Sequence, residues 1–319
     1  MRVFHGEARL RAPRQNIKSA GAARCGHANM TASEPRVRAA MAGRAPLPAL
    51  RTGHALVRIS RMAPPVAQSF ATCGQAAAPA GRAVLGTVLA HAPQSGLKPG
   101  SRVAAWALTA DIAGGHAQVS DAHALGVPDT LDAATALALP ALWPSAWMAL
   151  VEYAAVQPGD AVLVHEAATP LGRACLYLAH RLGAAPFALV HDAGQFAACR
   201  AAGAREVARY GDPWPALMRE HGGADVVLDP GAGTLLEPSV ACAARRARLV
   251  LIGAAAATAP ALLTPAALLP KGLRVLAASW SHARDAAAIR RAASQLMQWA
   301  LTAPPPWPQT WASPSEPLT

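Results

Sequence analysis

Short apolar runs alternate with helical stretches through the second half of the chain. The first run, Ala161–Val164, contains no polar residue, and leucines at helical spacing follow it as far as Gly183. Five further runs of strand length, mostly apolar, are Phe187–Val190, Glu206–Tyr210, Val226–Leu228, Leu249–Ile252 and Val275–Ala278. Strands that are apolar on both faces indicate a parallel sheet covered by helices on both sides. The pattern therefore predicts an α/β fold with a doubly wound parallel sheet.

The residues before this region follow a different pattern. From Arg51 to about Leu125, short apolar runs are broken by glycine and proline, which indicates a β-rich unit. Strands are expected at Ala55–Ile59, Ala83–Leu89 and Val103–Trp106. The spacing then becomes helical from Thr135 to Ala155, and Pro140 and Pro144 are expected to kink or split that segment.

The net charge of +11 belongs almost entirely to one end of the chain. Residues 1–62 hold twelve basic and two acidic residues, a net charge of +10, so the remainder is nearly neutral. The arginine-rich, acid-poor first forty residues suit an organellar transit peptide or translation upstream of a true start at Met30 or Met41. We favour the second interpretation. Nucleic-acid binding is not expected, because no aromatic residue lies among these arginines after Phe4.

The cysteines and the long uncharged runs indicate where in the cell the protein is expected. The five cysteines lie at least 24 residues apart, which fits reduced thiols in a cytoplasm and excludes a Cys-x-x-Cys zinc site. The two long uncharged runs, Ala133–Val151 and Leu249–Pro270, both carry internal prolines. They are therefore expected to be buried segments of a globular protein. No membrane span is predicted, and the expected location is cytoplasmic.

The segment after Ala161–Val164 is a candidate phosphate-binding turn. A dinucleotide site needs a strand, a glycine-rich bend and a helix whose N-terminus meets the diphosphate. The bend here reads His165-Glu-Ala-Ala-Thr-Pro-Leu-Gly172 and keeps only Gly172, the glycine that packs helix against strand. Glu166 and Thr169 replace small residues, and a carboxylate at position 166 that pointed inward would repel a diphosphate. The motif alone leaves two alternatives, a dinucleotide site or a Rossmann-type sheet that binds no cofactor.

An ordered series of motifs spans residues 51–311. It comprises Gly53–Arg58, Gly81–Val88, Lys98–Ala104, Gly114–Ala117, Val127–Asp129, Ala136–Pro140 with Ser145–Trp147, Gln157–His165 and Gly222–Asp229. In content and order the series resembles the medium-chain dehydrogenase/reductase superfamily, in particular its zinc-independent quinone oxidoreductase and enoyl reductase branch. The resemblance implies a GroES-like β domain, a Rossmann domain and a cleft between them for nicotinamide and substrate. The reaction it implies is NAD(P)H-dependent hydride transfer to a quinone or an activated alkene.

The same resemblance assigns cofactor-binding residues. Ser145 matches a residue near the nicotinamide, Tyr210 one that packs on the adenosine 2′-phosphate, and Gly253 a part of the backbone that lines the nicotinamide. The phosphate turn corresponds to Ala168, Thr169, Pro170, Leu171 and Gly172.

The choice between NADPH and NADH depends on the residues after the second apolar run. Asp192 has the spacing of an acid that binds the ribose 2′-hydroxyl of NAD. His191 and Tyr210 suit a 2′-phosphate, and Gln195 replaces a lysine that often grips it. NADP (NADPH) is the expected cofactor, with NAD as the alternative because of Asp192.

Three departures from the family pattern shape the remaining expectations. Gly81-Arg82-Ala83 stands where zinc-dependent members have Gly-His-Glu, so no metal is expected. Gln68 and Ser69 offer no evident proton donor, so no catalytic residue is assigned. The chain also ends without the strand that normally closes the catalytic domain, which leaves a non-enzymatic binding protein as the alternative function.

We therefore expect three parts. Residues 1–40 form a basic, disordered extension, and residues 41–150 with 281–319 form a GroES-like catalytic domain truncated at its C-terminal end. Residues 151–280 form the Rossmann dinucleotide-binding domain. The expected partners are a small-molecule substrate and, as one option, a second copy in a homodimer; no nucleic acid or membrane is expected.

Overall fold

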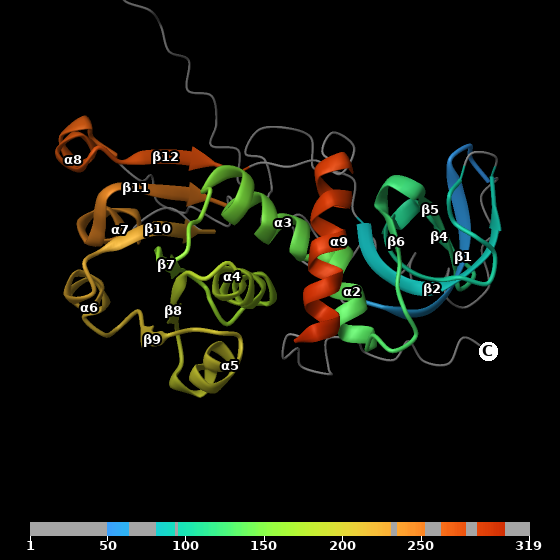
Figure 1. Ribbon diagram of the computed structural model, residues 1–319, viewed down its shortest axis with the longest axis horizontal. Helices are drawn as coiled ribbons and strands as arrows, with labels where there is room; N and C mark the ends of the chain where they lie inside the picture. Colours follow the sequence, from blue (N-terminus) through green and yellow to red (C-terminus); the bar gives the residue numbers. More distant parts are fainter. Residues whose placement is uncertain are drawn as a thin grey trace, which may run out of the picture.

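The computed structural model describes residues 50–63, 81–92, 95–230, 235–252, 263–278 and 286–303. These residues form two six-stranded sheets with helices packed between and around them (Figure 1). The predicted α/β fold class is confirmed. The expected extension at residues 1–40 lies outside the described residues, and the expected domain boundaries stay a prediction.

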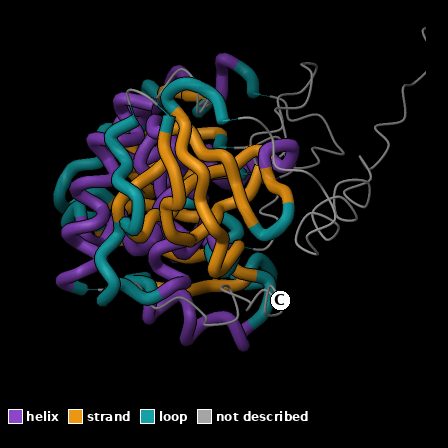
Figure 2. Tube along the Cα trace, turned by 90° about the vertical axis from the view of Figure 1, so that its right-hand side faces the viewer, coloured by secondary structure: helices purple, strands orange, loops and turns teal. Residues whose placement is uncertain are grey.

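The first sheet is antiparallel and contains the strands expected from the β-rich pattern, each somewhat longer than predicted. Its strand order is β4-β5-β1-β2-β3-β6. The strands are β1 (His54–Met62), β2 (Gly81–His91), β3 (Arg102–Leu108), β4 (Ile112–Ala113), β5 (His116–Ser120) and β6 (Ala124–Gly126), with 3₁₀ turns η2 (Thr109–Asp111) and η3 (Asp121–His123). Figure 2 looks onto this end of the molecule and shows strands at the centre with helices beside them.

The predicted helical segment after β6 is split, as its prolines indicated. It forms α2 (Ala133–Ala141), α3 (Trp143–Trp147) and the π-helix η4 (Met148–Tyr153). The Asp132 carboxylate accepts a hydrogen bond from the Thr135 amide at 2.9 Å and caps α2. The chain bends by 54° between α2 and α3. Within the described residues no single helix is long and apolar enough to cross a membrane, and this bent pair passes that test only by its combined length and composition.

The second sheet is parallel, with strand order β9-β8-β7-β10-β11-β12. Numbered along the chain, this is the 3-2-1-4-5-6 order of a Rossmann fold. The strands are β7 (Ala161–Val164), β8 (Ala185–Val190), β9 (Glu206–Arg209), β10 (Ala224–Asp229), β11 (Ala243–Leu251) and β12 (Arg274–Ala277). The helices are α4 (Pro170–Arg181), η5 (Ala193–Gln195), α5 (Phe196–Ala201), α6 (Trp214–Glu220), α7 (Leu236–Cys242), α8 (Pro265–Leu268), η7 (Leu269–Lys271) and α9 (Ala286–Thr302).

Of the three apolar clusters among the described residues, one runs through both halves of the molecule. It includes Leu85 from the first sheet, Trp143 from α3, Leu176 from α4 and Val164 from the second sheet, all almost fully buried. Helix α9 packs beside α2 and α3, so the last described helix lies between the two sheets (Figure 1). Because burial of such side chains is the main favourable term in folding, this core fixes the two halves against each other.

Strand β11 begins six residues earlier than the apolar pattern predicted. Its first part contains Arg245, Arg246 and Arg248, which hide the strand from a search for apolar runs. Arg246 has φ 60°, and the register with β10 shifts in this region, so the early part of the strand is irregular. The arginine nearest the regular part, Arg248, has a role that explains its presence.

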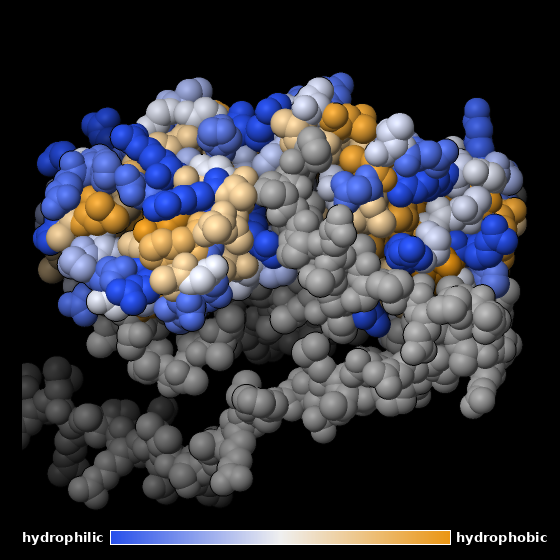
Figure 3. Space-filling model, turned by 90° about the horizontal axis from the view of Figure 1, so that it is seen from below, coloured by the Kyte–Doolittle hydropathy of each residue, from blue (hydrophilic) through white to orange (hydrophobic). Residues whose placement is uncertain are grey.

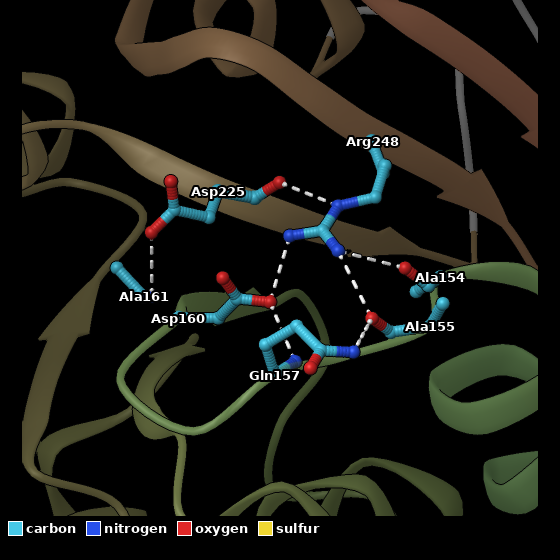
Figure 4. A network of polar contacts seen from close by, with 7 residues as sticks. All are labelled: Ala154, Ala155, Gln157, Asp160, Ala161, Asp225 and Arg248. Atoms are coloured by element: carbon cyan, nitrogen blue, oxygen red, sulfur yellow. Dashed lines mark hydrogen bonds and ion pairs between the residues drawn. The ribbon is translucent and has the colours of Figure 1, made fainter.

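Arg248 joins four segments at the amino end of the parallel sheet (Figure 4). Its guanidinium pairs with the Asp160 carboxylate at 2.7 Å, and both side chains are mostly buried, 12% and 16% exposed. It also donates to the carbonyl oxygens of Ala154 at 2.9 Å and Ala155 at 3.2 Å, just after η4, and to that of Asp225 at 3.4 Å. The planar guanidinium, with its five fixed donors, suits such a junction better than a lysine.

We expect Arg248→Met to lower the free energy of unfolding by about 3 kcal/mol, because it leaves the Asp160 carboxylate without its buried cation. Urea denaturation measures this change. The matched control is Arg245→Met on the same strand, where the arginine is exposed, and a change below about 0.5 kcal/mol is expected there. Equal losses for the two variants would contradict a special role for the Arg248 junction.

Candidate functional site

The candidate site lies where the strand order of the parallel sheet reverses. β7 lies between β8 and β10. From β8 the sheet continues outward to β9 on one side, and from β10 it continues to β11 and β12 on the other side. In open α/β sheets ligands bind outside the carboxyl ends of the strands at such a point. The turn from His165 to Thr169 follows β7 here and leads directly into α4, a helix of twelve residues.

Gly172 lets α4 approach the turn closely. A Cβ atom at this position would lie 2.6 Å from the Cα atom of Ala167 and against the carbonyl oxygen of Glu166. Both contacts are with backbone, which cannot move aside, so only glycine fits. The packing predicted for Gly172 from the sequence is therefore found in the structure, while a role in cofactor binding stays a prediction.

Glu166 has a backbone conformation that normally belongs to glycine. Its φ is 50°, in the left-handed region that a side chain disfavours by about 1–2 kcal/mol. Its carboxylate is directed to His191, whose Nε2 atom lies 2.8 Å from Oε1. The side chains of Glu166 and His191 are 35% and 69% exposed, so this is a surface contact. The carboxylate is thus held by the end of β8.

Most amide groups of the turn already have partners within the protein. The amide of Glu166 donates to the Tyr210 hydroxyl at 2.9 Å, and that of Gly172 to the Thr169 hydroxyl at 3.1 Å. Pro170 has no amide hydrogen. Over this described segment, the amides of Ala168 and Leu171 make no hydrogen bond to the protein. These two donors and the positive end of the α4 dipole are what the turn offers to an anion.

A buried polar cluster supports the turn from beneath. His165 is buried, its Nε2 atom lies 2.9 Å from the Ser239 hydroxyl, and its ring packs edge-on against Trp214. Burial lowers the pKa of His165, against the opposing charge of Asp229, so the ring is neutral at neutral pH. Burial raises the pKa of Tyr210, so its hydroxyl stays protonated.

Tyr210 contacts the turn directly through its hydroxyl. The sequence predicted that it packs on an adenosine 2′-phosphate. In the structure its hydroxyl supports the Glu166 amide, while its ring contacts that of His191 with centroids 4.7 Å apart. The predicted contact with a phosphate stays a prediction, and the support of the turn is a role that the sequence did not reveal.

The residues expected to decide between NADPH and NADH lie at the ends of β8 and β9. The Asp192 carboxylate accepts from the Gly194 amide at 2.6 Å, and the Gln195 side chain accepts from the Asp192 amide at 3.3 Å. Both side chains are thus used to cap η5. Arg209 ends β9, pairs with Asp212 at 2.8 Å and interacts electrostatically with Asp192. Sequence reasoning missed Arg209, although it directly precedes Tyr210.

The other expected site residues are less informative. Ser145 is buried on α3, which packs against α4, and Gly253 lies outside the described residues.

Burial raises the pKa of the Cys175 thiol to about 12, so this cysteine is not a nucleophile. Among the described residues no group of three or more His, Cys, Asp and Glu side chains could hold a metal ion. The expected absence of a metal stays a prediction.

Comparison with known proteins shows which family part of the chain resembles. A family described as zinc-binding dehydrogenase matches residues 170–299. The chain is 34% identical over 171 residues to the highly reducing polyketide synthase ZEA2 of Gibberella zeae, which covers 49% of this chain and 7% of that protein. It is 34% identical over 162 residues to the spectinabilin polyketide synthase protein NorB of Streptomyces orinoci, 50% of this chain and 7% of that protein. The chain thus spans a small part of the curated relatives it matches.

Solved structures agree with this match. A quinone oxidoreductase from Thermus thermophilus, also solved in complex with NADPH, is 27% identical, with a TM-score of 0.65 over 80% of this chain and 82% of that one. A quinone oxidoreductase from Pseudomonas syringae has the same fold, with 22% identity and a TM-score of 0.66 over 81% of this chain and 82% of that one. These matches support the resemblance of the chain to the medium-chain dehydrogenase/reductase superfamily. The family resemblance, including the quinone oxidoreductase-like branch, is confirmed.

We expect Glu166→Gly to be more stable than Glu166→Ala by about 1 kcal/mol. Both variants lose the contact with His191, but only glycine relieves the left-handed backbone. Thermal unfolding of the two variants side by side measures the difference. If they melt at the same temperature, φ at position 166 is not a source of strain.

Proposed function

We propose that this chain is an NADPH-dependent oxidoreductase that reduces a quinone or an activated alkene without zinc. The observation that carries the proposal is the turn between β7 and α4, where two open amides and a helix N-terminus meet at the reversal point of a Rossmann sheet. NADPH complexes of a structural relative and the polyketide synthase matches support the same assignment.

The residues present fit a dinucleotide phosphate. We assign the diphosphate to the amides of Ala168 and Leu171, with Thr169 and Pro170 shaping the turn and Gly172 allowing the close approach of α4. The cations for a 2′-phosphate are Arg209 and His191, because they lie at the ends of β9 and β8. Tyr210 holds the turn in place from below. Asp192, which would favour NAD, is held by the Gly194 amide and faced by Arg209.

The chain's contribution to the reaction is positioning. When bound, the dinucleotide supplies the hydride, and the protein holds and orients it. From the resemblance, Ser145 and Gly253 are assigned to the nicotinamide end. No side chain is assigned as proton donor, because reduction of an enone or a quinone can take its proton from water.

A second candidate function is a binding protein without catalysis. Two observations favour it: the carboxylate at position 166 of the turn, and the Thr169 hydroxyl, which occupies the Gly172 amide. A glycine-rich turn would leave more amides free for a diphosphate. Under this second proposal, the chain keeps the family fold and binds a small molecule without turnover.

A homodimer and a cytoplasmic location remain part of the proposal. β12 is an edge strand of the parallel sheet and carries the exposed Val275, which is where a second copy could add its own strand. Sedimentation velocity at micromolar concentration decides between monomer and dimer.

We expect the full chain to bind NADPH about tenfold more tightly than NADH, and Arg209→Gln to remove most of that preference, because a charge-assisted contact with the 2′-phosphate is lost. Fluorescence titration with both cofactors measures affinity, and loss of NADPH absorbance with a benzoquinone measures turnover. The matched control is Arg219→Gln, which removes an exposed arginine elsewhere.

Three results separate the alternatives. Binding with turnover supports the oxidoreductase, and binding without turnover supports the binding protein. Absence of NADPH binding at millimolar concentration removes the first proposal. In that case, binding that appears only in a Glu166→Gly/Thr169→Gly variant would identify the two replacements as its cause.

A further inference from the structure

A pocket lies at the amino ends of the parallel strands, whereas the phosphate turn lies at their carboxyl ends. It is formed where α4 and α5 end and where β8 and β9 begin, with the end of α9 beside it, and its volume is about 650 Å³. Small side chains leave this space open, among them Ala184, Ala201 and Ala204. The twelve residues of α4 separate the pocket from the turn by about 18 Å, so the two are distinct places on the molecule.

The charged residues that line this pocket all carry positive charge or can acquire it. They are His180, Arg181, Arg200 and Arg205, and no acidic side chain lines the pocket. Glu206 follows Arg205 directly, but it lines a small cavity on the other face of the sheet. In the part of the chain that the structure describes, none of the three arginines forms an ion pair. Like charges gathered without a counter-charge repel one another, and a bound anion relieves that repulsion.

These arginines are not needed to complete the helix ends. At the end of α4 the amides of Gly183 and Ala184 bond to the carbonyls of His180 and Ala179, both at 3.0 Å. At the end of α5 the amides of Gly203 and Ala204 bond to the carbonyls of Arg200 and Cys199 at 2.9 and 3.0 Å. The terminal carbonyls therefore accept hydrogen bonds from backbone amides, as in other helices that end at a residue with left-handed backbone conformation.

Arg181 contributes a partly buried guanidinium to the pocket lining. Its Nε atom is buried and makes no hydrogen bond in the described structure, while its guanidinium lies over the Trp299 ring at 5.5 Å. A buried donor without an acceptor costs about 1–3 kcal/mol, and nearly all such groups in proteins have a partner. Trp299 orients the guanidinium of Arg181 beside the pocket that this residue lines.

We propose that this pocket binds a phosphorylated small molecule that carries at least two negative charges. Arginine favours phosphate over other anions because its planar fork can donate two parallel hydrogen bonds to phosphate oxygens. Three arginines and a histidine suit a diphosphate or a pair of phosphates. On the face seen in Figure 3, hydrophilic and apolar side chains are mixed over the Rossmann half. The site is independent of the proposed oxidoreductase function.

The test is calorimetric titration of the full chain with sodium pyrophosphate at low ionic strength. We expect measurable binding that Arg200→Gln/Arg205→Gln weakens about thirtyfold, through the loss of two charge-assisted contacts. The control Arg245→Gln/Arg274→Gln makes the same change in net charge with two exposed arginines outside the pocket, and a change below about twofold is expected. Circular dichroism confirms that both variants are folded.

Three results would overturn the proposal. The first is no binding by the natural chain, and the second is equal weakening in the two double variants, which would reflect net charge alone. The third is undiminished binding in Arg200→Gln/Arg205→Gln, which would place the pyrophosphate elsewhere, such as at the phosphate turn. Since the arginines of the pocket do not contact the turn, this last result would leave the proposed oxidoreductase function intact.

Discussion

One guanidinium, that of Arg248, holds the amino end of the parallel sheet together. It connects β11 to the start of β7, to β10 and to the segment that enters from η4. β7 is only four residues long, so its two ends lie about 13 Å apart and are positioned together. The contact at one end of β7 therefore contributes to positioning the turn after Val164 at the other end. The candidate site depends in this way on a charge pair that does not touch it.

Much of the fold could be predicted from the sequence because its signals are local. Strand β7 has the predicted bounds, and the split of the helix between Pro140 and Pro144 follows from the chemistry of proline. The start of β11 could not be predicted, because its arginines interrupt the apolar run. Arg248 is placed by partners more than twenty residues away in sequence, and no pattern within the strand records them.

The candidate site was less predictable, because the contacts that shape it also join residues distant in sequence. Gly172 is recognisable because close packing of a helix on its strand demands glycine, whatever else surrounds it. The support of Glu166 by Tyr210 joins residues 44 positions apart, and the position of Arg209 beside Asp192 depends on the pairing of β8 with β9. Such contacts exist only once the sheet has formed. Motif spacing identifies where the turn is, and the folded chain decides which of its amides remain available.

The hydrogen bonds of the turn also bear on its behaviour between binding events. In a glycine-rich turn, an anion that departs leaves a row of amides that only water can satisfy. Here the hydroxyls of Thr169 and Tyr210 satisfy two of those amides from within the chain, and an anion that leaves exposes two others. An anion bound there as proposed would therefore leave fewer amides unsatisfied on its release than it would in a glycine-rich turn.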